Sequence, residues 1–150
     1  AVVRAKREKE QTELNRLKKI SKPIPMKLVS GTLPLKVYGD GRSRIFADVI
    51  FKLKGSFRIS HITARRSCYI ESTNSNAPGG SPGFRISVSK DGKNWETGLG
   101  FMGCDDIDFD ISPSITAEYV KMSISTAVVG SKGRVSTELF DPKFYGFRVK

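Results

Sequence analysis

Residues 85–95 constrain the fold more than any other segment of the chain. Ile86 and Val88 alternate with serines there, which is the two-residue period of a half-buried β-strand. The Asp91-Gly92 pair that follows indicates a tight turn, because the residues of a two-residue hairpin loop must tolerate a positive φ. Trp95, the one tryptophan of the chain, then supplies a large apolar side chain. The segment predicts a β-hairpin with a buried tryptophan.

Strand-like segments recur from residue 26 to the end of the chain, and clusters of turn residues separate them. The expected strands are residues 27–30, 34–38, 46–54, 57–64, 67–71, 84–89, 106–110, 118–125, 134–138 and 143–149. No helical pattern lies between these segments, so their spacing predicts an all-β fold, an antiparallel β-sandwich of the jelly-roll type.

The first part of the chain has a different composition. Residues 4–20 are rich in arginine, lysine, glutamate and leucine, which favour a helix, and contain no glycine or proline. A helix this polar is marginal alone in water, so it needs a partner to be stable. Pro23 and Pro25 end the helix and force an extended linker. We therefore expect a basic helical arm with its linker over residues 1–25 and a sandwich domain over residues 26–150.

Positive charge is concentrated in this arm. The chain carries a net charge of +11, of which residues 1–25 supply 8 − 3 = +5 and the other 125 residues supply +6. The interpretation we favour is an arm that docks on other protein subunits, with an apolar edge and basic side chains formed by Leu14, Leu17, Ile20, Arg16, Lys18 and Lys19. Contact with nucleic acid is less favoured, because the arm has no aromatic residue for base stacking. The third interpretation is that the arm is a helix exposed to solvent, with no partner.

Other bulk features limit the function classes. No run of about 20 apolar residues is present, and no signal peptide is visible at the N-terminus. Membrane insertion is not expected either, since residues 99–102 are the nearest candidate for an apolar loop and suit a core or a protein contact better. Cys68 and Cys104 allow one bridge or two free thiols, and the free thiols are the preferred reading.

The order of several short motifs resembles the discoidin family, also called coagulation factor 5/8 type C, of galactose-binding-like β-sandwiches. The motifs are Tyr38-Gly39-Asp40-Gly41, residues 46–62, residues 85–95, residues 117–124 and Phe144-Tyr145-Gly146. The resemblance covers roughly residues 34–147. The resemblance implies a β-sandwich whose loops at one end bind carbohydrate and which has no catalytic role.

The resemblance also implies particular site residues. In carbohydrate-binding members, an arginine after the second strand motif and an asparagine in the next loop bind sugar hydroxyls, and an aromatic ring stacks on the sugar. The matching candidates here are Arg65, Arg66, Tyr69, Asn74 and Asn76, with Tyr38 as an alternative ring. A structural calcium near Asp40 is also implied. Lys143 stands where the family often has an acidic residue, which argues against the metal, and we expect no cofactor.

Neither the histidine nor the aspartates of the chain form a catalytic pattern. His61 lies in the middle of an expected strand, with no nucleophile or orienting group at a suitable spacing, so a packed or surface histidine is expected. Asp105, Asp106, Asp108 and Asp110 alternate with apolar residues, and we interpret them as a solvated strand face instead of a calcium site.

These observations predict a structural or adhesion module of a large assembly, not an enzyme. A bacteriophage virion fits this description, as a tail, baseplate, fibre or capsid-attached protein that also binds host glycans. One alternative is a carbohydrate-binding module of a longer enzyme or cell-surface protein. The other is a capsid protein whose basic arm contacts nucleic acid.

Overall fold

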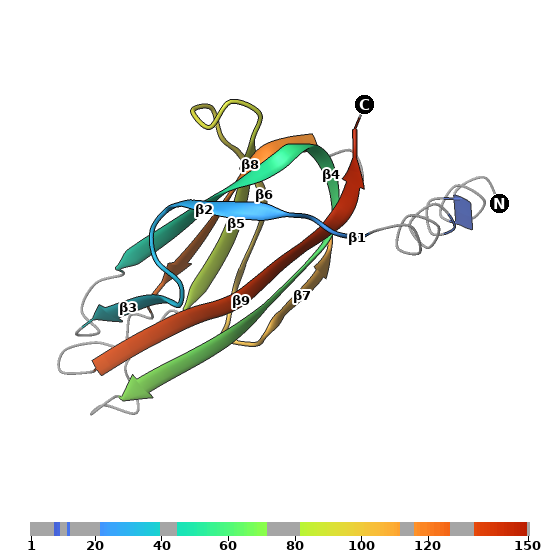
Figure 1. The fold of residues 1–150 in the computed structure, drawn as a ribbon. Helices are drawn as coiled ribbons and strands as arrows, with labels where there is room; N and C mark the ends of the chain where they lie inside the picture. Colours follow the sequence, from blue (N-terminus) through green and yellow to red (C-terminus); the bar gives the residue numbers. More distant parts are fainter. Residues whose placement is uncertain are drawn as a thin grey trace.

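The computed structural model describes residues 8–9, 12, 22–39, 45–71, 82–111, 116–126 and 134–149. Antiparallel strands make up almost all of this part of the chain, so the prediction of an antiparallel β-sandwich is confirmed (Figure 1). No helix within the same ranges is long and apolar enough to span a membrane. The helical arm stays a prediction, because Glu8, Lys9 and Thr12 are the only described residues before residue 22.

Two layers of strands form the sandwich. The first layer contains, in spatial order, β2 (Met26–Ser30), the beginning of β4 (Phe46–Glu71), β8 (Thr116–Ser125), β5 (Gly83–Ser89) and β6 (Glu96–Met102). In the second layer, β1 (Lys22–Pro23) and β3 (Leu35–Gly39) pair with β9 (Arg134–Arg148), which pairs with the remainder of β4, and β7 (Ile107–Asp110) lies on the other side of β4.

Strand β4 joins the two layers because it is hydrogen-bonded in both. Residues 46–52 pair with β8 and residues 59–71 pair with β9, whereas Phe57 and Arg58 pair with both. Between them the strand bends at Gly55, whose φ of 130° is a conformation that favours glycine. The guanidinium of Arg148 donates a 2.9 Å hydrogen bond to the carbonyl of Lys54 and lies 5.4 Å from the ring centre of Phe57. The end of β9 therefore holds the bend in place.

Several predicted strands are fused in the structure. The segments 46–54, 57–64 and 67–71 all belong to β4, and both 134–138 and 143–149 fall in β9. Their apparent breaks lie at the bend and at the bulge that includes Asp141-Pro142, and a second bulge, at Ser60, falls within the predicted segment 57–64. A bulge shifts the side-chain alternation without ending the strand, so the sequence pattern shows a gap where pairing continues.

The core lies between the layers and is filled by the inward-facing residues of each strand. Phe51 and Phe144 meet edge to face at its centre, with ring centroids 5.7 Å apart. Fully buried aliphatic side chains surround this pair: Val49, Leu53, Ile59, Ile62, Ile86, Ile107, Val120, Met122, Ile124 and Leu139. This packing makes the described strands one structural unit.

The segment expected to be a linker is partly built into the sandwich. Lys22 and Pro23 pair with Gly146 and Tyr145 of β9, and the next residue, Ile24, is 6% exposed. The Ile24 amide also donates a 2.8 Å hydrogen bond to the carbonyl of Phe144. Residues 22–24 therefore belong with the domain instead of with a free linker.

The prediction of a two-residue turn at Asp91-Gly92 is wrong. Residues 90–95 form a longer connection between β5 and β6, and the sequence reading missed β6 because its glycines weaken the strand pattern. The Asp91 carboxylate accepts 2.8 Å hydrogen bonds from the amides of Lys93 and Asn94, so it organises the loop. Trp95 is half-buried, with the Lys121 ammonium 4.5 Å from its ring centre.

Replacing Asp91 by asparagine tests this loop. The amides of Asn94 and Lys93 lower the pKa of the Asp91 carboxyl well below its usual range. A lowered pKa stabilises the fold above the unfolded-state pKa, about 3.9, and this stabilisation is lost as the pH falls further. We expect Asp91→Asn to lower the melting temperature at neutral pH, and the difference from the wild type to disappear in acid. A constant difference across the pH series would contradict the charged-carboxylate explanation.

Replacing Gly146 by alanine tests the close approach of β9 to β4 beside the Ser60 bulge. A β-carbon at Gly146 would overlap the carbonyl of Arg58, so β9 could not keep its register beside β4. We expect Gly146→Ala to lower the free energy of unfolding by about 1–3 kcal/mol or more in urea titrations. Gly100→Ala is the matched control, because its new methyl group would lie 3.5 Å from the nearest atom, an ordinary contact.

Candidate ligand-binding site

The face of the second layer that points away from the core carries most of the candidate residues. Side chains alternate along β4, so His61, Thr63, Arg65, Ser67 and Tyr69 point outward whereas Ile62, Ala64 and Arg66 are buried. The neighbouring strands β3, β9 and β7 add their own outward residues to the same surface. We call this surface the outer face of the second layer.

Two exposed tyrosines occupy one end of this outer face. Tyr38 of β3 and Tyr69 of β4 both pair with Ser136 of β9, so they lie in one row across three strands. Two strand separations, about 10 Å, lie between their backbones. The rings are 65% and 58% exposed, and β3 and β4 end beside the start of β9 in this region (Figure 1). We call these two residues the tyrosine row.

A shallow depression of about 320 Å³ lies further along the same face, at the Asp141-Pro142 bulge. Several of its lining residues are charged, namely Arg65, Asp106, Asp108, Asp141 and Lys143, and Tyr145 also lines it. Asp141 has a φ of 52°, a conformation that non-glycine residues adopt rarely and that marks a local strain. Between the depression and the tyrosine row, Arg65 stacks 5.1 Å above the Phe140 ring.

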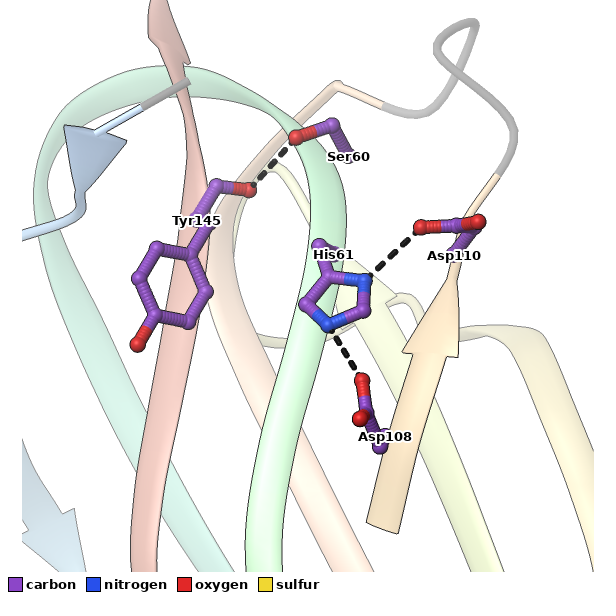
Figure 2. Close-up of polar contacts among 5 residues, drawn as sticks. All are labelled: Ser60, His61, Asp108, Asp110 and Tyr145. Carbon is purple, nitrogen blue, oxygen red and sulfur yellow. Dashed lines mark hydrogen bonds and ion pairs between the residues drawn. The ribbon is translucent and has the colours of Figure 1, made fainter. Parts of the chain in front are cut away.

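His61 lies beyond the depression and contacts two carboxylates of β7 (Figure 2). Its Nε2 is 2.6 Å from Asp108 Oδ1, and its Nδ1 is 2.8 Å from Asp110 Oδ1. A neutral imidazole has one N–H, so donating to both carboxylates at once requires the imidazolium form. The reading of a solvated acidic strand face is therefore incomplete, because two of its carboxylates bracket the histidine.

The serine, histidine and aspartates in Figure 2 are not arranged as a catalytic relay. The Ser60 hydroxyl donates a 3.2 Å hydrogen bond to the carbonyl of Tyr145 and points away from the imidazole. Both ring nitrogens of His61 face carboxylates of β7 and not the Ser60 hydroxyl. Within the described ranges, no group of three or more histidine, cysteine, aspartate or glutamate side chains could hold a metal ion.

Arg66 lies on the inner side of β4 and is only 7% exposed. Its Nη2 donates a 2.8 Å hydrogen bond to the hydroxyl of Thr137, but its Nε and Nη1 are buried with no partner among the described residues. Desolvation by burial lowers the pKa of the Arg66 guanidinium. The amide of Arg66 donates to Asp106 Oδ1 at 2.9 Å, which fixes the backbone here.

A disulfide bond joins Cys68 and Cys104, so the preference for two free thiols is wrong. The two Cα atoms are 6.1 Å apart, within the usual range for such a bond. The sequence could not decide this, because the cysteines are 36 positions apart and nothing between them indicates how β7 returns to β4. The bond ties the end of β4 to the segment before β7, beside Thr137 and Arg66.

The predicted glycan residues are thus divided between two sides of β4. Arg65 and Tyr69 are on the outer face, and Arg66 is beneath it. Asn74, Asn76 and Asp40 lie outside the described residues, as do the arm residues Leu14, Arg16, Leu17, Lys18, Lys19 and Ile20. The sequence reading missed Phe140, Asp141 and Lys143, because the bulge hides which way the side chains of β9 point. The Asp141-Pro142 pair was the available signal.

Arg66→Met tests whether the buried guanidinium is unsatisfied. A buried donor without a partner costs about 1–3 kcal/mol, and an apolar side chain of similar length removes that cost. We expect Arg66→Met to raise the free energy of unfolding by about this amount in chemical denaturation. Arg65→Met, one residue away on the exposed face, is the control and should change it by less than about 0.5 kcal/mol. A loss of stability in Arg66→Met would mean that its N–H groups have acceptors outside the described residues.

Comparisons with known proteins support the fold. No protein-family model and no curated protein matches the chain. A family 89 glycoside hydrolase from Clostridium perfringens superposes with a TM-score of 0.50 and 13% identity over 85% of this chain and 14% of its own length. CBM32-3 from a family 31 glycoside hydrolase of the same organism superposes with a TM-score of 0.47 and 12% identity, over 87% of this chain and 94% of its own length.

The C-terminal domain of a chitobiase from Bacteroides fragilis gives a TM-score of 0.48 and 16% identity, over 89% of this chain and 98% of its own. At 13% identity, the likeness to the family 89 glycoside hydrolase indicates a shared β-sandwich fold and nothing finer. The resemblance to the discoidin family thus holds at the level of the fold, and membership of the family stays a prediction.

Proposed function

We propose that this domain binds carbohydrate without catalysing a reaction, as a module of a longer enzyme or cell-surface protein. The observation that carries the proposal is the tyrosine row, Tyr38 and Tyr69, on the outer face of the second layer. Tyrosine offers a rigid ring and a hydroxyl at little entropic cost, and so suits the apolar faces and hydroxyl groups of sugars. Two such rings in one row fit an extended glycan.

The rest of the outer face supports this proposal. Alternating cations, carboxylates and hydroxyls, such as Lys36 paired with Glu138 at 3.4 Å, supply polar groups between the tyrosine row and the depression. Sugars present many hydroxyls that both donate and accept, so a mixed polar surface suits them better than a surface of one charge. The disulfide between Cys68 and Cys104 is typical of oxidising surroundings and supports a location outside the cytoplasm.

This proposal prefers the carbohydrate-binding alternative to a bacteriophage virion protein. The virion hypothesis depended on analogy with phage proteins of this fold and on the arm-plus-sandwich layout, and the arm lies mostly outside the described residues. The solved structures with a similar fold include CBM32-3 of a glycoside hydrolase, whereas no observation on the described surface favours a virion. The docking arm and the contact with nucleic acid stay predictions.

A glycan array tests the proposed function. We expect the wild type to bind at least one neutral glycan, and the Tyr38→Ala/Tyr69→Ala double variant to bind it at least about tenfold more weakly, a loss of about 1.4 kcal/mol. Val29→Ala is the control, because Val29 is also an exposed apolar residue, at 47%, but lies in β2 of the first layer. It should bind as the wild type does.

Arg66→Met on the same array separates the outer face from the end loops. Loss of binding in this variant, with the tyrosine variant unaffected, would move the site to the loop end that the family resemblance implies. An absence of binding to every glycan would contradict the proposed function itself, provided that circular dichroism confirms the fold of each protein.

A further inference from the structure

A second hollow lies on the opposite side of the sandwich, on the face of the first layer that points away from the core. It has a volume of about 780 Å³, within the range of small-molecule sites, and crosses four adjacent strands, β4, β8, β5 and β6. We call it the groove. Its lining includes Phe46, Asp48, Arg85, Lys121, Ser87 and Ser123.

Small residues of β8, β5 and β6 lie in the rows beside Phe46 and Asp48 of β4 and form the low part of the groove. Along one row, Phe46 of β4 pairs with Ser125 of β8, which pairs with Gly83 of β5. In the next row, Asp48 pairs with Ser123 and then with Arg85. Gly100 of β6 leaves room for the side chain of Arg85, whose Cγ would lie 3.9 Å from a β-carbon at that position. Arg85 therefore leans toward β6 and leaves the serines as the floor.

The floor holds a polar side chain that faces the groove. Ser87 points away from the core and is 7% exposed, and its hydroxyl opens into the groove. A ligand in the groove can donate a hydrogen bond to this hydroxyl or accept one from it. Thr97 adds a further hydroxyl to the lining.

Charged and aromatic groups stand around this floor. Arg85 and Lys121 supply two cations against the one carboxylate of Asp48, and neither Arg85 nor Asp48 has an ion-pair partner among the described residues. Lys121 is held in position by the ring of Trp95, 4.5 Å from its ammonium. Phe46 offers an exposed ring at the edge. The planar guanidinium of arginine matches a carboxylate in a paired geometry.

The geometry points to the groove as a separate binding site for a saccharide that bears a carboxylate, such as a uronic acid oligomer. Arg85 and Lys121 pair with the carboxylate, Ser87 and Ser123 bond to ring hydroxyls, and Phe46 stacks on a sugar face. Asp48 accepts from a further hydroxyl and repels a ligand of higher negative charge, which disfavours nucleic acid. The inference goes beyond the proposed function, because the groove and the tyrosine row lie on opposite faces.

Binding of galacturonic acid oligomers, measured by calorimetry on the whole chain, tests this inference. We expect the wild type to bind an oligogalacturonate, and its fully methyl-esterified form to bind at least about tenfold more weakly. Arg85→Gln retains a polar side chain but removes its positive charge. This variant should bind oligogalacturonate more weakly by a similar factor. Both Arg85→Gln and Phe46→Ala change exposed side chains, so folding should be preserved.

Two controls separate this site from the tyrosine row. Lys36→Gln removes an exposed cation from the second layer, and the Tyr38→Ala/Tyr69→Ala variant removes the tyrosine row. Both variants should bind oligogalacturonate with the affinity of the wild type. Loss of that affinity in the tyrosine variant but not in Arg85→Gln would overturn the inference while supporting the proposed function. Absent binding, equal affinity for the ester, or displacement by oligothymidine at equal concentration would each overturn it as well.

Discussion

The pairing of β4 with both β8 and β9 is the constraint on which the sandwich depends. One strand of 26 residues contributes hydrogen bonds to each layer, so the position of the bend at Gly55 determines how the layers face each other. The Arg148 contacts with Lys54 and Phe57 bring the end of the chain to this bend. Both candidate binding surfaces depend on this strand, because β4 contributes outward-facing residues to each layer.

The sequence predicted the fold well where local patterns decide it. Alternation in residues 84–89 and 118–125 anticipated β5 and β8 closely, because one face of each strand is core and the other is polar. It failed where pairing overrides the local signal. The turn residues Asp91-Gly92 sit in a longer loop that a carboxylate organises, and the bulge at Asp141-Pro142 continues a strand that the pattern divides.

The candidate site was less predictable, since it depends on which way side chains point. Arg65 and Arg66 look equivalent in the sequence, but one step along β4 separates an exposed stacked side chain from a buried one with two unpaired N–H groups. The tyrosine row requires the register of three strands, which no local motif encodes. The disulfide likewise depends on the return of β7 to β4, a long-range feature of the topology.

Arg66 and the two tyrosines of the tyrosine row differ in burial, and this difference decides what each can contribute to stability and to ligand binding. A buried guanidinium with two donors that have no partner among the described residues weakens the fold, because those donors lose their hydrogen bonds to water. The tyrosines carry no such cost, because water reaches them on the surface. A ligand on the outer face would therefore gain affinity only from its contacts with the two rings. A ligand that accepted hydrogen bonds from Arg66 would also satisfy two donors that have no partner among the described residues.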